Sequence, residues 1–176
     1  MQLNTSDSKL ATYCAISGLC VQDQSILAEY LSRIEAHLPA VTDAFYDALL
    51  ADAQTAPYLE GRLEGLKATH LSWIRQIFCG VYDDVFVKIQ ERIGEAHVRA
   101  HVPPHFVAAS ISHLRAALSG LIQSVEPDLE RSTRAVKAMM QVLGLCHYLI
   151  DSKYSETLMG NLGISPALLT RLQTLK

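Results

Sequence analysis

Three histidines at intervals of four residues lie between positions 97 and 105, where the chain is best suited to bind a metal. Neutral imidazole is a common metal ligand, and a helix brings residues three and four positions apart onto one face. On such a face, His97 would have apolar or small neighbours, among them Ile93, Gly94 and Ala100. We therefore predict a low apolar surface on which a flat macrocycle could lie, with His97 reaching its metal.

Two other interpretations of these histidines stay open. A zinc site is one of them, but Pro103 and Pro104 end the helix before His105. His97 and His101 alone would then remain, whereas zinc sites usually take three or four protein ligands. The second is that His97 is a partly buried histidine bonded to a carbonyl group, because a single histidine is weak evidence for a site.

The helical period dominates the chain, and no convincing alternating pattern of a strand is found. This predicts an all-α fold. The expected helices cover approximately residues 23–37, 39–50, 61–79, 83–102, 104–125, 128–160 and 166 onward, with a turn or short helix at 56–57. Asp83 and Ser165 suit N-terminal caps, Gly80 suits a C-terminal cap, and prolines begin or end several helices.

The helix expected near residues 128–160 is apolar nearly all round between positions 135 and 150. A helix without a clearly polar face is usually buried on more than one side. In a domain of this size, a second copy of the chain is the natural cover, so we expect a homodimer.

Composition restricts the function. Apolar residues make up 49% of the 176-residue chain and charged residues 19%, as in a folded single domain. The net charge of -3, without a basic patch, gives nucleic-acid binding little support. No apolar run is long enough to cross a membrane, and the N-terminus lacks the hydrophobic core of a signal peptide. We therefore expect a cytoplasmic protein.

The four cysteines, Cys14, Cys20, Cys79 and Cys146, form no Cys-x-x-Cys pair. A thiolate zinc site or a redox motif is therefore not expected. We interpret all four as small buried apolar side chains in a reducing compartment.

Two motifs together resemble the sensor globins of globin-coupled sensors. The first is a Phe-Tyr pair on an early helix, here Phe45 and Tyr46. The second is an Ile-Gly-x-x-His stretch followed by a proline, here residues 93–97 and Pro103. In addition, the Tyr-Asp-Asp sequence at 82–84 resembles the start of the proximal helix in that family.

This resemblance covers about residues 22–155 and implies a globin-like fold that lacks the usual short fourth helix and has an extra N-terminal segment. It also implies heme b as the cofactor. His97 matches the proximal iron ligand, and Ile93 belongs to the motif beside the heme. Imidazole suits this role, and the pocket on the other side of the heme then decides how the iron is used.

On the distal side, Tyr46 matches the tyrosine that donates a hydrogen bond to bound oxygen. Phe45 would pack beside the heme. Leu66 and Thr69 match positions that control ligand access and polarity. Without the family pattern, Tyr46 would be interpreted as a core tyrosine whose hydroxyl reaches the surface.

Two further histidines complicate the heme site. His101 stands where the family more often has glycine, and it could perturb the local helix or compete as a ligand. His70 lies on the apolar stripe of the expected distal helix, next to Thr69. We interpret His70 as a hydrogen-bonded core histidine, although it could also take the sixth coordination position of the iron.

The function implied by the resemblance is a heme-based oxygen sensor that also binds CO and NO. Two copies would pair through their last two long helices and regulate an output domain in cis, among which we favour a diguanylate cyclase. The chain itself carries no Gly-Gly-Asp-Glu-Phe-like motif, so we expect no enzyme activity from it. The corresponding division is an N-terminal extension (1–21), a sensor globin domain (22–160) and the start of a linker helix (161–176).

Two alternatives remain. A heme enzyme such as a nitric oxide dioxygenase would use a similar pocket, but no flavin or nicotinamide motif supplies its electrons. A helical dimerisation module without cofactor would also need an apolar helix.

Overall fold

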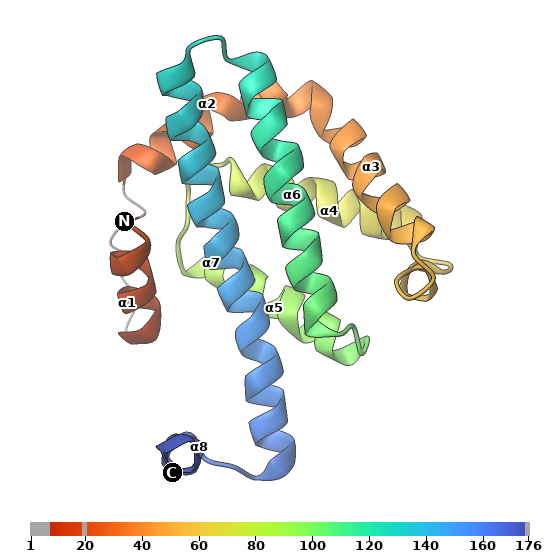
Figure 1. Ribbon diagram of the computed structural model, residues 1–176, viewed down its shortest axis with the longest axis vertical. Coiled ribbons are helices and arrows are strands. Elements are labelled where there is room, and N and C mark those ends of the chain that lie inside the picture. The colour runs from red at the N-terminus through yellow and green to blue at the C-terminus, as the bar shows by residue number, and fades with distance from the viewer. Residues whose placement is uncertain (1–7, 19–20, 175–176) are drawn as a thin grey trace.

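The computed structural model describes residues 8–18 and 21–174, and this part of the chain folds into helices without a strand (Figure 1). The predicted all-α fold is therefore confirmed. The helices are α1 (Ser8–Ser17), α2 (Val21–Ile34), α3 (Leu38–Ala51), α4 (Leu63–Ile77), α5 (Asp84–Arg99), α6 (Pro104–Val125), α7 (Leu129–Leu162) and α8 (Pro166–Thr174), with short 3₁₀ helices η1 (Glu35–His37) and η2 (Ala56–Leu59). Cys20 and the outer ends of both predicted terminal segments lie outside the described residues.

Capping side chains and prolines set several helix boundaries as predicted. The Asp83 carboxylate accepts hydrogen bonds from the backbone N–H groups of Val85 and Phe86, at 3.0 and 2.9 Å, and so caps α5. Asp128 caps α7 in the same way, and the Ser165 hydroxyl accepts from a backbone N–H of α8. Pro104 occupies the first turn of α6, where its missing N–H is not needed.

Several helix ends differ from the prediction. The helix expected to reach His37 changes to the 3₁₀ form after Ile34, and α4 is shorter at both ends than expected. Phe78, not Gly80, is the C-cap of α4. Gly80 instead adopts a left-handed φ of +73°, and a Cβ there would lie 2.7 Å from the carbonyl oxygen of Gln24. Tertiary packing against α2 therefore explains this glycine.

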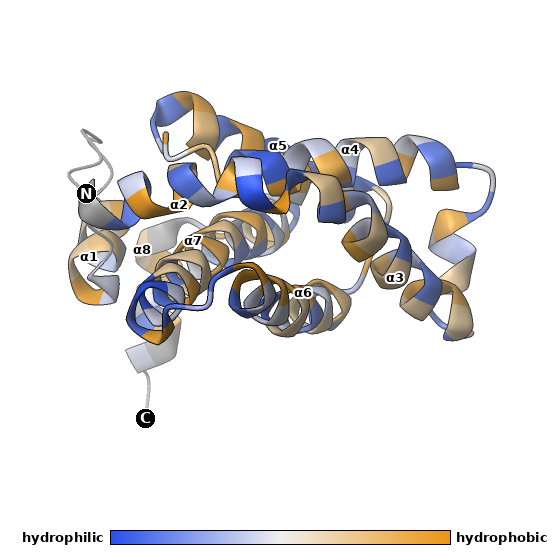
Figure 2. Ribbon diagram, turned by 90° about the horizontal axis from the view of Figure 1, so that it is seen from above, coloured by the Kyte–Doolittle hydropathy of each residue, from blue (hydrophilic) through white to orange (hydrophobic). Residues whose placement is uncertain are grey.

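The long helix α7 is the centre of the fold. It packs against α2, α5 and α6, with additional contacts to α1 and α4. Figure 1 shows α6 and α7 side by side, and Figure 2 shows that both ribbons carry apolar and polar residues. Most of the apolar stretch predicted to need a second copy is thus covered by the chain's own helices. Met140 is an exception, with an exposed fraction of 44%.

Helix α5 approaches α7 very closely at Gly94. A Cβ on this residue would lie 2.6 Å from the carbonyl oxygen of Ile150 and 2.7 Å from Cγ of Lys153. The expectation that Gly94 forms part of the apolar surface for a macrocycle is wrong, because Gly94 does not line the pocket. Gly94 makes room for α7, because it lies on the side of α5 that faces this helix.

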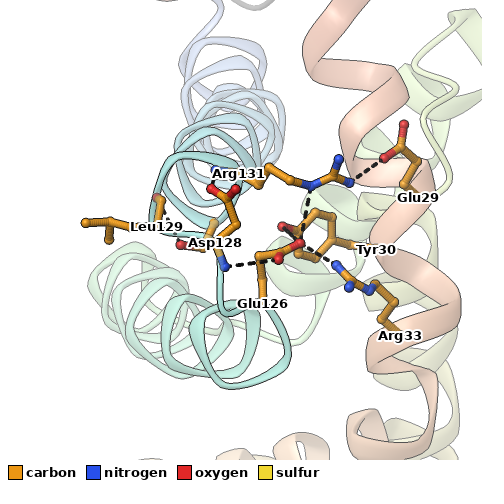
Figure 3. A network of polar contacts seen from close by, with 8 residues as sticks. Glu29, Tyr30, Arg33, Glu126, Asp128, Leu129 and Arg131 are labelled. Carbon is orange, nitrogen blue, oxygen red and sulfur yellow. Dashed lines mark hydrogen bonds and ion pairs between the residues drawn. The ribbon is translucent and has the colours of Figure 1, made fainter.

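A buried carboxylate joins α2 to the turn between α6 and α7 (Figure 3). Glu126 accepts hydrogen bonds from the Tyr30 hydroxyl at 3.0 Å, from Arg33, and from Arg131 at 3.4 Å. Hydrogen bonds from Arg33 and from the backbone N–H of Asp128 lower the pKa of Glu126 to about 2. This network stabilises the α6–α7 corner with the carboxylate in its ionised form.

The cysteine prediction holds for two residues. Cys14 and Cys146 are free and buried, whereas Cys79 is free but only partly buried, in the turn that follows α4. Its Sγ lies 3.4 Å from the carbonyl oxygen of Val81.

As for membranes, no described helix is both long and apolar enough to cross one.

We expect Glu126→Gln to lower the stability of the fold at neutral pH and to flatten its dependence on acid. The lowered pKa of Glu126 gives a contribution that is complete above the ordinary carboxyl pKa of 4.5 and is lost as the pH falls towards about 2. Urea midpoints at about pH 6 and about pH 3 measure this effect. If the unmodified protein and Glu126→Gln lose equal stability between about pH 6 and about pH 3, the role of the ionised Glu126 carboxylate is contradicted.

We expect Gly94→Ala to destabilise the fold by about 1–3 kcal/mol, because the new methyl group overlaps the α7 backbone. Gly120→Ala in α6 is the matched control, since nothing lies within 4 Å of the added carbon. The free energy of unfolding of Gly120→Ala should rise by about 0.5–1 kcal/mol, because alanine has the better helix propensity. Equilibrium unfolding in urea compares the two, and similar effects would show that the α5–α7 approach is not tight.

Candidate functional site

A pocket of about 610 Å³ lies among α3, α4, α5 and α6. Its volume falls within the range of about 300–1,000 Å³ that small-molecule and cofactor sites usually have. All six residues for which a role at a cofactor was predicted line this one pocket: Phe45, Tyr46, Leu66, Thr69, Ile93 and His97. The structure therefore brings together residues from three helices, and their roles towards a cofactor stay predictions.

The wall of the pocket is largely apolar. Besides the predicted residues, α6 contributes a row of side chains, α3 adds Leu49, and α7 adds Ile150. The α6 row consists of Phe106, Val107, Ser110, Ile111 and Leu114. A pocket of this size and character fits a flat apolar macrocycle such as heme.

The imidazole of His97 is oriented by its own helix. Its Nδ1 lies 2.8 Å from the carbonyl oxygen of Ile93, and since a carbonyl can only accept, Nδ1 carries the proton. The lone pair is then on Nε2. Burial lowers the pKa of His97, which favours the neutral ring. A hydrogen bond to one ring nitrogen that leaves the other free is the usual arrangement of a metal-binding histidine.

Three aromatic rings from α3 and α4 pack together in the pocket. The His70 ring is stacked on Phe45 with 4.6 Å between centroids, and Tyr46 contacts both rings edge to face. His70 also stacks on Trp73. This packing holds the polar atoms of His70 and Tyr46 in defined positions.

Two polar groups of this cluster lack partners among the described residues. His70 is hydrogen-bonded as expected, through Nδ1 to the Thr42 hydroxyl at 3.2 Å, but its buried Nε2 has no partner there. Burial, assisted by His113, lowers the pKa of His70 to about 4, so the ring is neutral near pH 7. The Tyr46 hydroxyl likewise makes no hydrogen bond in the described part of the chain, and burial raises its pKa to about 12. Both groups can bind a polar ligand in the pocket.

On α4, Leu66 lies one turn before His70, and Thr69 directly precedes it. Leu66 is half-buried and Thr69 is exposed, so they lie towards the mouth of the pocket. The Thr69 hydroxyl bonds to the carbonyl oxygens of Leu66 and Gly65, at 2.9 and 3.1 Å. The hydroxyl proton is therefore used within the helix.

Sequence reasoning missed two arginines. Arg62, directly before α4, and Arg92, on α5, are exposed and supply the only lysine or arginine side chains among the described residues that line the pocket. They are suited to bind the carboxylates of a ligand whose apolar body lies deeper. Arg92 lies one turn before Ala96, which also lines the pocket, whereas nothing in the pattern indicates Arg62.

A buried hydrogen bond joins the two helices that carry the candidate residues. Trp73 Nε1 on α4 donates to Gln90 Oε1 on α5 at 2.7 Å, and Gln90 is fully buried. A buried glutamine among apolar residues is a detectable feature of the sequence, but its partner is not. This bond fixes the spacing between the His70 and His97 helices.

His101 does not line the pocket and is exposed. It has a φ of +55°, the left-handed conformation that glycine adopts most readily. Helix α5 ends at Arg99, before the expected limit, because the backbone reverses at His101.

For the zinc alternative, the described residues contain no group of three or more His, Cys, Asp or Glu side chains that could hold a metal ion.

Comparisons with known proteins agree with this geometry. The protoglobin family model matches residues 6–159. The globin domain of a Geobacter sulfurreducens globin-coupled sensor is 28% identical, with a TM-score of 0.77 over 81% of this chain and 95% of that chain. The ferric form of the globin domain of E. coli DosC is 22% identical, with a TM-score of 0.71 over 81% and 99%. Its ferrous form is 17% identical, with a TM-score of 0.62 over 84% and 91%. The likeness confirms the predicted globin-like fold.

Proposed function

Because this chain belongs to the protoglobin family, we propose that it is a heme-based gas-sensor domain whose pocket holds heme b with His97 as the iron ligand. The observation that carries this proposal is the orientation of His97. Its Nδ1 is bonded to the Ile93 carbonyl, its Nε2 has no hydrogen-bond partner among the described residues, and the ring lies in a pocket of suitable size. The alternative of a cofactor-free dimerisation module gives no reason for this arrangement.

The remaining contacts suit the same cofactor. Phe45, Leu66 and Ile93 supply apolar surface, and Arg62 and Arg92 can pair with the two carboxylates of heme at the pocket rim. A bound ferrous heme supplies an open coordination position for O₂, CO or NO. The chain's part in gas binding is to exclude water from this space and to orient hydrogen-bond donors within it.

Tyr46 is the donor that we assign to a diatomic ligand. Its raised pKa keeps the hydroxyl protonated at neutral pH, and the described residues do not use the proton. Thr69 supplies polarity nearer the mouth. A phenol donor favours the more polar O₂ over CO, which supports oxygen as the ligand.

The regulatory part of the proposal concerns the ends of the chain. Residues 22–160 form the sensor domain, 1–21 an extension, and 161–176 the beginning of a linker to an output domain in cis, for which we favour a diguanylate cyclase. A homodimer would form through α6 and α7, where Met140 and Leu129 remain exposed with fractions of 44% and 77%. The sensor domain itself would not be an enzyme, and we propose a cytoplasmic location.

We expect His97→Ala to weaken heme retention at least about 100-fold, since the direct ligand should matter no less than its supporting partners. Absorption spectra of the purified protein, oxidised, reduced and exposed to CO, measure the bound heme. His101→Gly is the control, because His101 lies outside the pocket and glycine accepts its positive φ. Full retention with an unchanged Soret band in His97→Ala would refute the assignment.

We expect Tyr46→Phe to release O₂ about fivefold faster, as the loss of one hydrogen bond of ordinary strength predicts. CO release should change less than about twofold, because CO is the poorer acceptor. Stopped-flow displacement and flash photolysis give the two rates. Equal acceleration for both gases would mean that Tyr46 acts through the shape of the pocket.

A further inference from the structure

The backbone of His97 takes part in the cap that ends α5. The N–H of Val102 donates to the carbonyl oxygen of His97 and the N–H of His101 donates to that of Val98, both at 3.0 Å. With His101 in the left-handed conformation, this is a Schellman motif. A displacement of the cap therefore acts directly on the peptide that carries the His97 ring.

Two tyrosines from different parts of the fold hold this cap. The Tyr58 hydroxyl of η2 donates to the carbonyl oxygen of His101 at 3.1 Å. The Tyr154 hydroxyl of α7 donates to that of Val102 at 2.8 Å. Burial is the largest cause that raises the pKa of Tyr154 to about 12, so its proton is present at neutral pH. The two neighbouring carbonyls are thus bonded to two different elements.

Helices α5 and α7 are joined on both sides of His97. Before it, Gly94 lies against the Ile150 backbone, and Lys153 is 3.7 Å from the Glu95 carboxylate. After it, the cap is bonded to Tyr154, four residues beyond Ile150 and therefore one turn along α7. His97 therefore lies between two contacts that join α5 to successive turns of α7.

Beyond Tyr154, α7 leaves the body of the domain. Figure 1 shows its last turns projecting away from the other helices, with α8 at their far end. Residues 155–162 are exposed except for Met159, so few contacts resist their movement. The turn of α7 that contains Tyr154 is therefore the last one that packs against the rest of the domain.

We propose that Tyr154 is a positioning residue for His97, and that its bond to the α5 cap transmits changes at His97 to the projecting end of α7. This inference rests on the proposed function, because the change at His97 is the binding of a gas to heme. The alternative is that the packing at Gly94 alone couples α5 to α7. In that case, removal of the Tyr154 hydroxyl would have no effect.

The test compares Tyr154→Phe with Tyr58→Phe in the full chain. Each variant loses one hydroxyl that donates to the same cap and keeps its ring, so a general loosening of the cap would affect both. Backbone hydrogen exchange is measured at Val102 and at 155–162 in three states, which are heme-free, ferrous and ferrous with CO. Resonance Raman spectra of the ferrous protein give the iron–histidine stretching frequency.

In the heme-free chain, we expect Tyr154→Phe to speed exchange at Val102 about fivefold, the effect of one hydrogen bond. In the heme-loaded protein, CO should change exchange at 155–162, and Tyr154→Phe should abolish this difference and shift the stretching frequency. Tyr58→Phe should keep the CO-dependent difference.

The proposal is overturned if Tyr154→Phe keeps the difference seen in the unmodified protein, or if Tyr58→Phe loses it equally. An unmodified protein without a Soret band would instead refute the proposed function, and with it the link to gas binding. A normal Soret band together with an unaffected CO response in Tyr154→Phe refutes only the role of Tyr154.

Discussion

The arrangement of this domain depends on how closely α5 approaches α7 at Gly94. Where a Cβ would lie 2.6 Å from a carbonyl oxygen, only a residue without a side chain allows the contact. With that side of α5 against the α7 backbone, the side that carries Ile93 and His97 faces the pocket. The orientation of the candidate ligand and its proximity to α7 therefore follow from one contact.

The polar groups of the pocket divide into two kinds. The hydrogen bonds of His97 to Ile93 and of Trp73 to the Gln90 side-chain oxygen hold the walls in place. The Tyr46 hydroxyl and the Nε2 of His70 have no partner within the described residues. Since buried polar groups are normally hydrogen-bonded, such groups mark the place where a ligand is expected. Rigid walls and unpaired groups together make a preorganised site.

Sequence patterns predicted those features that depend on neighbouring residues. The caps of α5 and α8 and the start of α6 follow from Asp83, Ser165 and Pro104, whose effects act within one turn. Features that depend on distant segments were missed or misassigned. Gly94 was assigned to the wrong neighbour, because periodicity identifies a face of a helix but not what covers it. Arg62 reaches the pocket only through the fold of the chain before α4.

Trp73 is the chain's single tryptophan, and its indole ring lines the pocket. Its emission therefore comes from one place only. Heme absorbs strongly where tryptophan emits, so energy transfer over the short distance across the pocket would quench the fluorescence of any molecule that holds the cofactor. The tryptophan fluorescence of this protein therefore measures the fraction of molecules whose pocket holds heme, and it does so without a label or a mutation.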